Sequence, residues 1–166
     1  MMDLSKQILK DAVLEEIAPK PARTNPATRT NLVDHWSPSI LLERAAYLRK
    51  LARAGDGSAS ETLREYPQHF AMLSYRSRDG EAEVHEGFAD LFYVLAGAAT
   101  LVTGGTVIGP RAAGPGETRG KAIEGGSRRD LRAGDVAHVP AGVPHQMLVS
   151  SEKTFTCFVL KIQQPA

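Results

Sequence analysis

Cysteine is nearly absent from this sequence, because Cys157 is the only one among 166 residues. An intramolecular disulfide framework is therefore excluded. Cys157 stands in the apolar run from Phe155 to Leu160. That setting favours a buried structural thiol over a catalytic nucleophile.

Long hydrophobic runs are also missing. No stretch of about 18 consecutive apolar residues occurs, so the sequence contains no candidate membrane-spanning helix. From Asp3 to Ile17, charged and apolar residues alternate, which is not the pattern of a secretory signal. We therefore expect a cytoplasmic protein that has no membrane partner.

An excess of charge of one sign is lacking as well. Twenty Lys and Arg residues stand against nineteen Asp and Glu residues, which leaves a formal net charge of +1. Together with the lack of a helix-turn-helix signature, this balance argues against a nucleic-acid partner. The length fits one domain with a single core. The partner we expect is a small molecule.

Helices are expected only in the first third of the chain. Residues 4–17 place apolar side chains near one helical stripe, whereas residues 19–31, which mix Pro, Thr, Asn and basic residues, are typical of a linker. A second helix is predicted from Ser37 as N-cap and Pro38 in the first turn to Gly55 as the stop. Its apolar face comprises Leu41, Ala45, Leu48 and Leu51.

The rest of the chain predicts short strands punctuated by glycine and proline. The predicted strands are 69–76, 81–85, 88–95, 98–103, 121–124, 127–131, 135–139, 146–149 and 155–162. No helical pattern interrupts them. A series of this kind is typical of a β-sandwich or barrel, a class that includes the jelly rolls.

The segment from Gly104 to Gly126 is expected to be a long loop over one end of a barrel, because it is rich in glycine and contains Pro110 and Pro115. Its basic residues, with those that follow it, are Arg111, Arg119, Lys121, Arg128, Arg129 and Arg132. A solvated surface is favoured over an anion-binding role for them, since charge runs usually face water.

Two segments carry residues suited to chemistry. In the first, Glu83 and His85 are two positions apart on a predicted strand, so their side chains point to the same face, and Asp90 follows on the next strand. In the second, a turn at Gly134 precedes a short strand and a Pro/Gly-rich bend that presents His145.

The first segment resembles the first sequence motif of the cupin superfamily. That motif has two histidines separated by one residue, a carboxylate five positions after the second histidine, and a glycine seven positions later. His85, Asp90 and Gly97 match this spacing. Glu83 stands where the first histidine usually is, and Asp90 stands where glutamate is usual.

The second segment resembles the second cupin motif in full. Gly134, Pro140, Gly142 and His145 have its spacing, although Val149 replaces the asparagine that usually follows. The resemblance implies a small single-domain cupin: a mainly β protein with one jelly-roll barrel and an N-terminal helical extension. The implied division is a helical extension and linker at residues 1–62 and a barrel at residues 63–166.

The resemblance also implies a divalent metal ion in the barrel, either Fe, Mn, Ni or Zn. Its implied ligands are His85, Asp90, His145 and, less directly, Glu83. Two histidines and one carboxylate agree with the facial arrangement of non-haem iron sites. Because Asp is one methylene shorter than Glu, Asp90 must lie closer to the metal or bind through water. The alternative is a barrel without metal, whose histidines only form hydrogen bonds in a polar pocket.

His138 is a further candidate. It shares a strand face with Val136 and Pro140, and the spacing leaves open whether that face is the interior. Inside the barrel, His138 would be a candidate general base or additional ligand. Outside it, His138 would be an exposed polar residue.

Other notable residues have structural interpretations. His35 and His69 lie outside both motifs and are expected at surface or capping positions. Phe92 and Tyr93 are adjacent on a strand, so one should line the cavity and the other should face outward. Trp36, beside the helix start, is expected to hold the N-terminal segment against the barrel.

Two functions remain open at this stage. One is a metal-dependent oxygenase, isomerase or lyase that acts on a small polar organic molecule, and the other is a non-catalytic module that binds or senses a small ligand, with or without metal. A homodimer is expected, because the N-terminal helix offers apolar surface beyond what one barrel needs.

Overall fold

The computed structural model describes residues 33–165. The helix expected at residues 4–17 and the linker expected at residues 19–31 lie outside the described residues. The chain divides into two compact units, Met1–His35 and Trp36–Ala166, and every element below belongs to the second. Within residues 33–165, no helix has the length and apolar character needed to cross a membrane.

The predicted helix is confirmed as α2 (Pro38–Ala54). The Ser37 hydroxyl caps its first turn by accepting a backbone N–H bond of 3.3 Å. At the other end, the Gly55 N–H donates to the carbonyl of Leu51 over 3.0 Å. The buried residues of the helix are Leu41, Ala45, Leu48 and Ala52. Leu51, which we expected on this face, is half-buried.

After the helix, the described chain forms twelve strands. They are β1 (Ser58–Tyr66), β2 (His69–Arg76), β3 (Ala82–His85), β4 (Phe88–Thr103), β5 (Thr106–Ile108), β6 (Arg111–Gly114), β7 (Glu117–Gly120), β8 (Ala122–Glu124), β9 (Ser127–Arg132), β10 (Val136–Val139), β11 (His145–Leu148) and β12 (Phe155–Gln163). The predicted strands agree with these to within a few residues, except that 88–95 and 98–103 form the single strand β4.

The expectation of a long loop at residues 104–126 is wrong. This segment forms β5 to β8: β5 pairs with β8, and β6 pairs with β7, which in turn pairs with β3. Glycine lies in the turns between these strands, as at Gly109 and Gly116, where φ is 62° and 67°. The high glycine content therefore marks tight turns in a small β structure and does not indicate an irregular loop.

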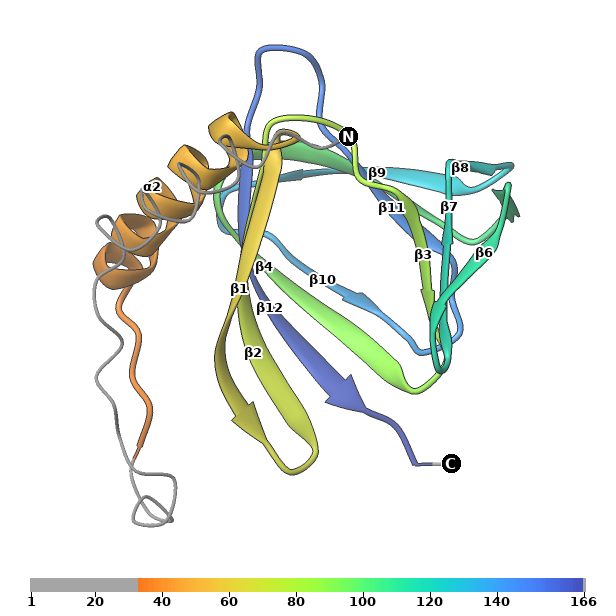
Figure 1. The fold of residues 1–166 in the computed structure, drawn as a ribbon, viewed down its shortest axis with the longest axis horizontal. Coiled ribbons are helices and arrows are strands. Elements are labelled where there is room, and N and C mark those ends of the chain that lie inside the picture. The colour runs from red at the N-terminus through yellow and green to blue at the C-terminus, as the bar shows by residue number, and fades with distance from the viewer. Residues whose placement is uncertain (1–32, 166) are drawn as a thin grey trace, which may run out of the picture. The chain divides into compact units, whose positions relative to one another are not determined.

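β4 connects two sheets that curl around a common interior (Figure 1). Its first part lies between β12 and β10 in a sheet that also contains β1 and β2. From Ala98 onward it lies between β9 and β11 in a sheet that continues through β3, β7 and β6. Gly97, with φ of 79°, stands between the two parts. The mainly β jelly-roll architecture with an N-terminal helix is thus confirmed.

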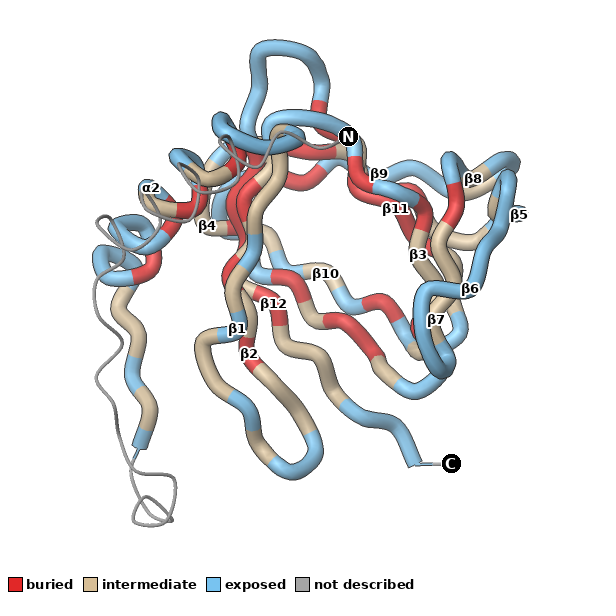
Figure 2. Tube along the Cα trace, viewed as in Figure 1, coloured by how far each residue is buried: buried red, intermediate tan, exposed pale blue. Residues whose placement is uncertain are grey.

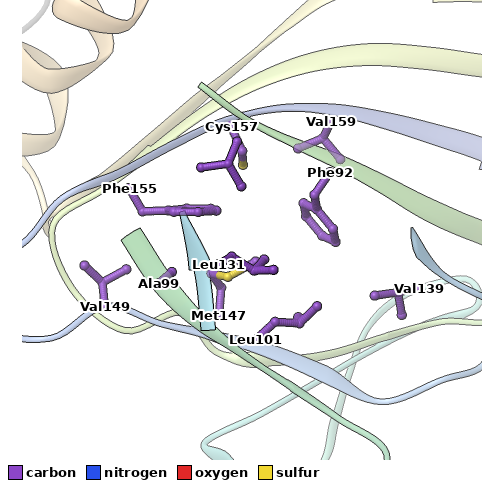
Figure 3. Close-up of a cluster of buried hydrophobic side chains, with 11 residues drawn as sticks. Phe92, Ala99, Leu101, Leu131, Val139, Met147, Val149, Phe155, Cys157 and Val159 are labelled. Carbon is purple, nitrogen blue, oxygen red and sulfur yellow. The ribbon is translucent and has the colours of Figure 1, made fainter. Parts of the chain in front are cut away.

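Two hydrophobic clusters stabilise this arrangement. The cluster between the sheets is drawn in Figure 3 and consists of Phe92, Val94, Ala99, Leu101, Leu131, Val139, Met147, Val149, Phe155, Cys157 and Val159. The other joins the buried stripe of α2 to Leu73 and Tyr75 of β2. Figure 2 shows where the chain of α2 and the sheet is buried. Trp36 belongs to this second cluster, and its ring centroid lies 6.0 Å from that of Phe158.

Candidate metal centre

The candidate site lies in the interior between the two sheets, where both histidines of the motifs meet. Nitrogen and oxygen atoms of Glu83, His85 and His145 all lie within 4.8 Å of one another. Asp90 enters from β4, and its Oδ2 is 3.5 Å from His85 Nε2 and 3.3 Å from His145 Nε2. The shorter side chain of Asp90 therefore reaches both imidazoles.

Each imidazole is oriented by a bond from its other nitrogen. His85 Nδ1 donates to Glu117 Oε2 over 2.5 Å, and the two residues face each other across the β3–β7 pair. His145 Nδ1 donates to the carbonyl oxygen of Val143 over 3.1 Å. Both Nε2 atoms consequently point into the site, which is the arrangement that metal-binding histidines usually show.

Two buried atoms in the site have no hydrogen-bond partner among residues 33–165: His145 Nε2 and Asp90 Oδ1. Their residues are 4% and 2% exposed. Leaving such atoms unpaired costs about 1–3 kcal/mol each. A neutral imidazole nitrogen and a carboxylate oxygen are ligands that divalent first-row metals accept. The residues present therefore fit a divalent cation.

Glu83 is held by two arginines. Its Oε1 forms an ion pair with Arg119, the residue opposite it on β7, and a longer one of 3.7 Å with Arg76. Its Oε2 lies 3.3 Å from His85 Nε2. Burial raises the pKa of Glu83, but His85 and the charge of Arg119 outweigh this effect and lower the pKa to about 2. Glu83 is therefore ionised at neutral pH, with one oxygen available to the site.

Lys161, on β12, brings a positive charge into the site. Its Nζ donates to Asp90 Oδ2 over 2.7 Å and lies 2.5 Å from His85 Nε2. Although burial raises the pKa of Asp90, the two histidines and Lys161 hold it well below its usual range. For His85, burial lowers the pKa, but the carboxylates of Asp90 and Glu83 outweigh it and raise the pKa to about 9.

A cavity of about 250 Å³ adjoins these residues. Its charged lining residues are Arg76, Arg119, Lys161, Glu81, Glu83 and Asp90. Apolar side chains, among them Met72, Phe92 and Val159, complete the wall. Cavities for drug-sized ligands are about 300–1,000 Å³, so this one suits a smaller molecule.

The structure does not bring His138 to the site. His138 is exposed on β10, whereas the next residue, Val139, is buried in the core. Because side chains alternate along a strand, His138 faces outward. Phe92 and Tyr93 divide as expected, with Phe92 lining the cavity and Tyr93 40% exposed.

Cys157 is confirmed as a buried thiol. It is 3% exposed, and burial raises its pKa to about 12. It packs in the core cluster with Val149, the residue in place of the usual asparagine. A thiol that stays protonated at neutral pH is a poor nucleophile, so Cys157 has a structural role.

Sequence reasoning missed Lys161 and Glu117. Lys161 could have been found from the alternation of side chains along β12. It lies two, four and six positions after Val159, Cys157 and Phe155, which face inward, so it shares their face. Glu117 could not have been found in this way, because the glycine and proline content of its segment predicts a loop. Once β7 is recognised as a strand beside β3, Glu117 is the neighbour of His85.

No protein-family model matches the sequence, and no curated protein matches it. Many solved structures resemble it in fold, among them three with TM-scores of 0.52 to 0.54. An uncharacterised conserved protein with a double-stranded β-helix domain from Klebsiella pneumoniae gives a TM-score of 0.54 at 16% identity, over 79% of this chain and 90% of that one. Protein TT1209 from Thermus thermophilus gives a TM-score of 0.52 at 19% identity, over 75% of this chain and 95% of that one.

The third is a variant of salicylate 1,2-dioxygenase from Pseudoaminobacter salicylatoxidans in complex with gentisate. It gives a TM-score of 0.52 at 16% identity, over 73% of this chain and 31% of that chain. Identities this low establish the fold alone. They identify the chain as having a double-stranded β-helix fold, which agrees with the expected cupin barrel, and the histidines of the two motifs meet in the interior between its sheets.

Proposed function

We propose that the protein is a metal-dependent enzyme of the oxygenase, isomerase or lyase type that acts on a small polar organic molecule. The observation that supports this most directly is the convergence of two imidazole Nε2 atoms and two ionised carboxylates beside a small cavity. His145 Nε2 is buried there without a hydrogen-bond partner in the part of the chain that the structure describes. Packing alone gives no reason for such an arrangement.

In this proposal, the ligands of the metal are Glu83, His85, Asp90 and His145, and the ion is Fe, Mn, Ni or Zn. When bound, it would act as a Lewis acid or activate oxygen. Glu117 fixes the tautomer and direction of the His85 ring. Arg119 holds Glu83 so that one carboxylate oxygen remains directed at the histidines.

The fold neighbours support an enzyme only in general terms. One of them is named as a dioxygenase that acts on salicylate and was solved with gentisate. A single fold hosts many reactions, so the reaction type here rests on the ligand set and cavity. The cavity of about 250 Å³ limits the substrate to a small molecule.

A second candidate is a non-catalytic cupin that binds a small ligand. The observation that favours it is that the ammonium group of Lys161 is hydrogen-bonded to Asp90 and His85, two of the proposed metal ligands. In a permanently metal-free barrel, Lys161 would serve as the counter-charge of the two carboxylates. The two candidates therefore differ in whether a metal is bound and whether it has an open coordination position.

Elemental analysis of the protein, purified without metal affinity, tests the proposal. We expect close to one divalent metal per chain in the wild type and almost none in His85→Ala and His145→Ala. His138→Ala is the matched control, because His138 is an exposed histidine outside the site, and it should retain the metal.

Substitution of cobalt then tests for an open coordination position. Titration with azide should change the visible absorption of the cobalt-loaded protein if a position is free for substrate. A folded wild type that remains metal-free after incubation with each candidate metal would overturn the proposal and favour the binding module. If azide does not change the visible absorption of the cobalt-loaded protein, the result would argue against an enzyme while still supporting the metal site.

A further inference from the structure

Lys161 and a bound metal require the same atoms. In the neutral form of His85, in which Nδ1–H donates to Glu117, Nε2 carries one lone pair, and Lys161 Nζ lies 2.5 Å from it. Only this form of His85 can bind a metal through Nε2. Asp90 Oδ2, the oxygen nearest both imidazoles, accepts from the same ammonium group over 2.7 Å. A metal ion that took either ligand would therefore have to displace the ammonium group.

The burial of Lys161 strengthens this competition. Its side chain is 13% exposed, and that of Asp90 is 2% exposed. Charge-assisted hydrogen bonds between buried groups are stronger than those at the surface. The ammonium group therefore stabilises the site while no metal is present, and the cost of displacing it makes metal binding less favourable.

The displaced ammonium group would remain beside the cavity, because Lys161 lines it. The charged lining consists of three basic residues and three acidic residues, so their formal charges cancel. A divalent ion adds two positive charges to this balance. The cavity would then favour an anion. Of the three basic lining residues described, Arg76 and Arg119 already contact Glu83, so the freed ammonium group would be available to an anion.

We propose that Lys161 is an internal cation that a divalent metal displaces from His85 and Asp90, and that it then binds the anionic group of a small carboxylate ligand. This inference rests on the proposed function, because it requires the same metal site. It adds a substrate class, small carboxylates, and a residue that sets both metal affinity and ligand affinity.

The test compares wild type, Lys161→Met and Lys161→Gln at one fixed pH, with Lys153→Met as the control because Lys153 is exposed. Zinc is titrated by calorimetry, and malonate is then titrated into the zinc-loaded proteins. We expect both Lys161 variants to bind zinc at least about tenfold more tightly, because no ammonium group must be displaced. We expect them to bind malonate at least about tenfold more weakly, and the control to match the wild type.

Opposite changes in the two affinities would not arise from a merely structural role, which would weaken both. Lys161→Gln keeps an N–H donor for Asp90, so it remains informative if Lys161→Met fails to fold. Equal or weaker zinc binding by the variants would overturn the competition while leaving the metal site established. Tighter zinc binding with unchanged malonate affinity would overturn the ligand class. Failure of all four proteins to bind zinc, iron, manganese or nickel would overturn the inference together with the proposed function.

Discussion

At the scale of single residues, Glu117 is the clearest example of a side chain that acts through another. It lies on β7 opposite His85 and accepts the Nδ1–H bond of 2.5 Å. A carboxylate in this position makes an imidazole a better metal ligand and fixes its orientation. Glu117 is therefore a positioning residue, and its side chain is 29% exposed, so its substitution should be tolerated by the fold.

We predict that Glu117→Gln lowers metal affinity by about 10- to 100-fold, because an amide oxygen accepts a weaker hydrogen bond from His85 Nδ1–H than a carboxylate does. Metal titration by calorimetry measures the change. Glu124→Gln, at an exposed position of β8, is the control and should bind metal as the wild type does. Equal affinities for the two variants would contradict the positioning role.

The residues of the site differ in how well the sequence predicts them. Motif spacing identifies His85, Asp90 and His145. In the structure, Asp90 Oδ2 lies within 3.5 Å of the Nε2 atom of each histidine. Lys161 belongs to no motif, and only its spacing of two from the core residue Val159 indicates that it faces inward. His138 shows the converse, since a histidine at a plausible spacing can face solvent.

At the scale of elements, the passage of β4 from one sheet to the other depends on Gly97. Its φ is 79°, and an added Cβ would collide with the backbone carbonyl oxygen of Thr154. A left-handed backbone costs a residue other than glycine about 1–3 kcal/mol, and this collision adds to the cost. The glycine of the first motif therefore has a physical function: it permits one strand to serve both sheets and the β11–β12 connection to pass close by.

We predict that Gly97→Ala lowers the free energy of unfolding by at least about 2 kcal/mol. Urea denaturation followed by the fluorescence of Trp36, the only tryptophan, measures this change. Gly87→Ala is the matched control, because a Cβ there meets no heavy atom within 4 Å. A Gly97→Ala variant as stable as the Gly87→Ala variant would contradict the steric argument.

Elements with strong local signals are predicted well, and those determined by tertiary pairing are not. α2 has its cap, its proline and its terminal glycine in the sequence, and both ends agree with the structure. β1 (Ser58–Tyr66) is poor in β-branched residues, and its strand form follows from pairing with β2 along its length. The short strands β5, β6 and β7 were not predicted, because the glycine and proline residues around them indicate a loop.

At the scale of the whole molecule, the fold class could be predicted because two motifs fix the strands that carry the site. The division at residue 63, the homodimer and the cytoplasmic location stay predictions. A metal site between two sheets would affect the stability of the entire domain, because the proposed ligands come from β3, β4 and β11. A metal ion that binds only the assembled site must stabilise the folded state relative to the unfolded chain.

We predict that metal at about 100 times its dissociation constant adds about 2.7 kcal/mol to the free energy of unfolding. For a domain of this size, that corresponds to a rise in melting temperature of roughly 5–10 °C. Differential scanning calorimetry of metal-loaded protein, with and without EDTA, measures the difference. His145→Ala should lose the metal-dependent rise, whereas His138→Ala should keep it. A rise of the same size in His145→Ala would mean that the metal stabilises the protein from another position, since the unpartnered Nε2 of His145 is the atom that a metal between the sheets would bind.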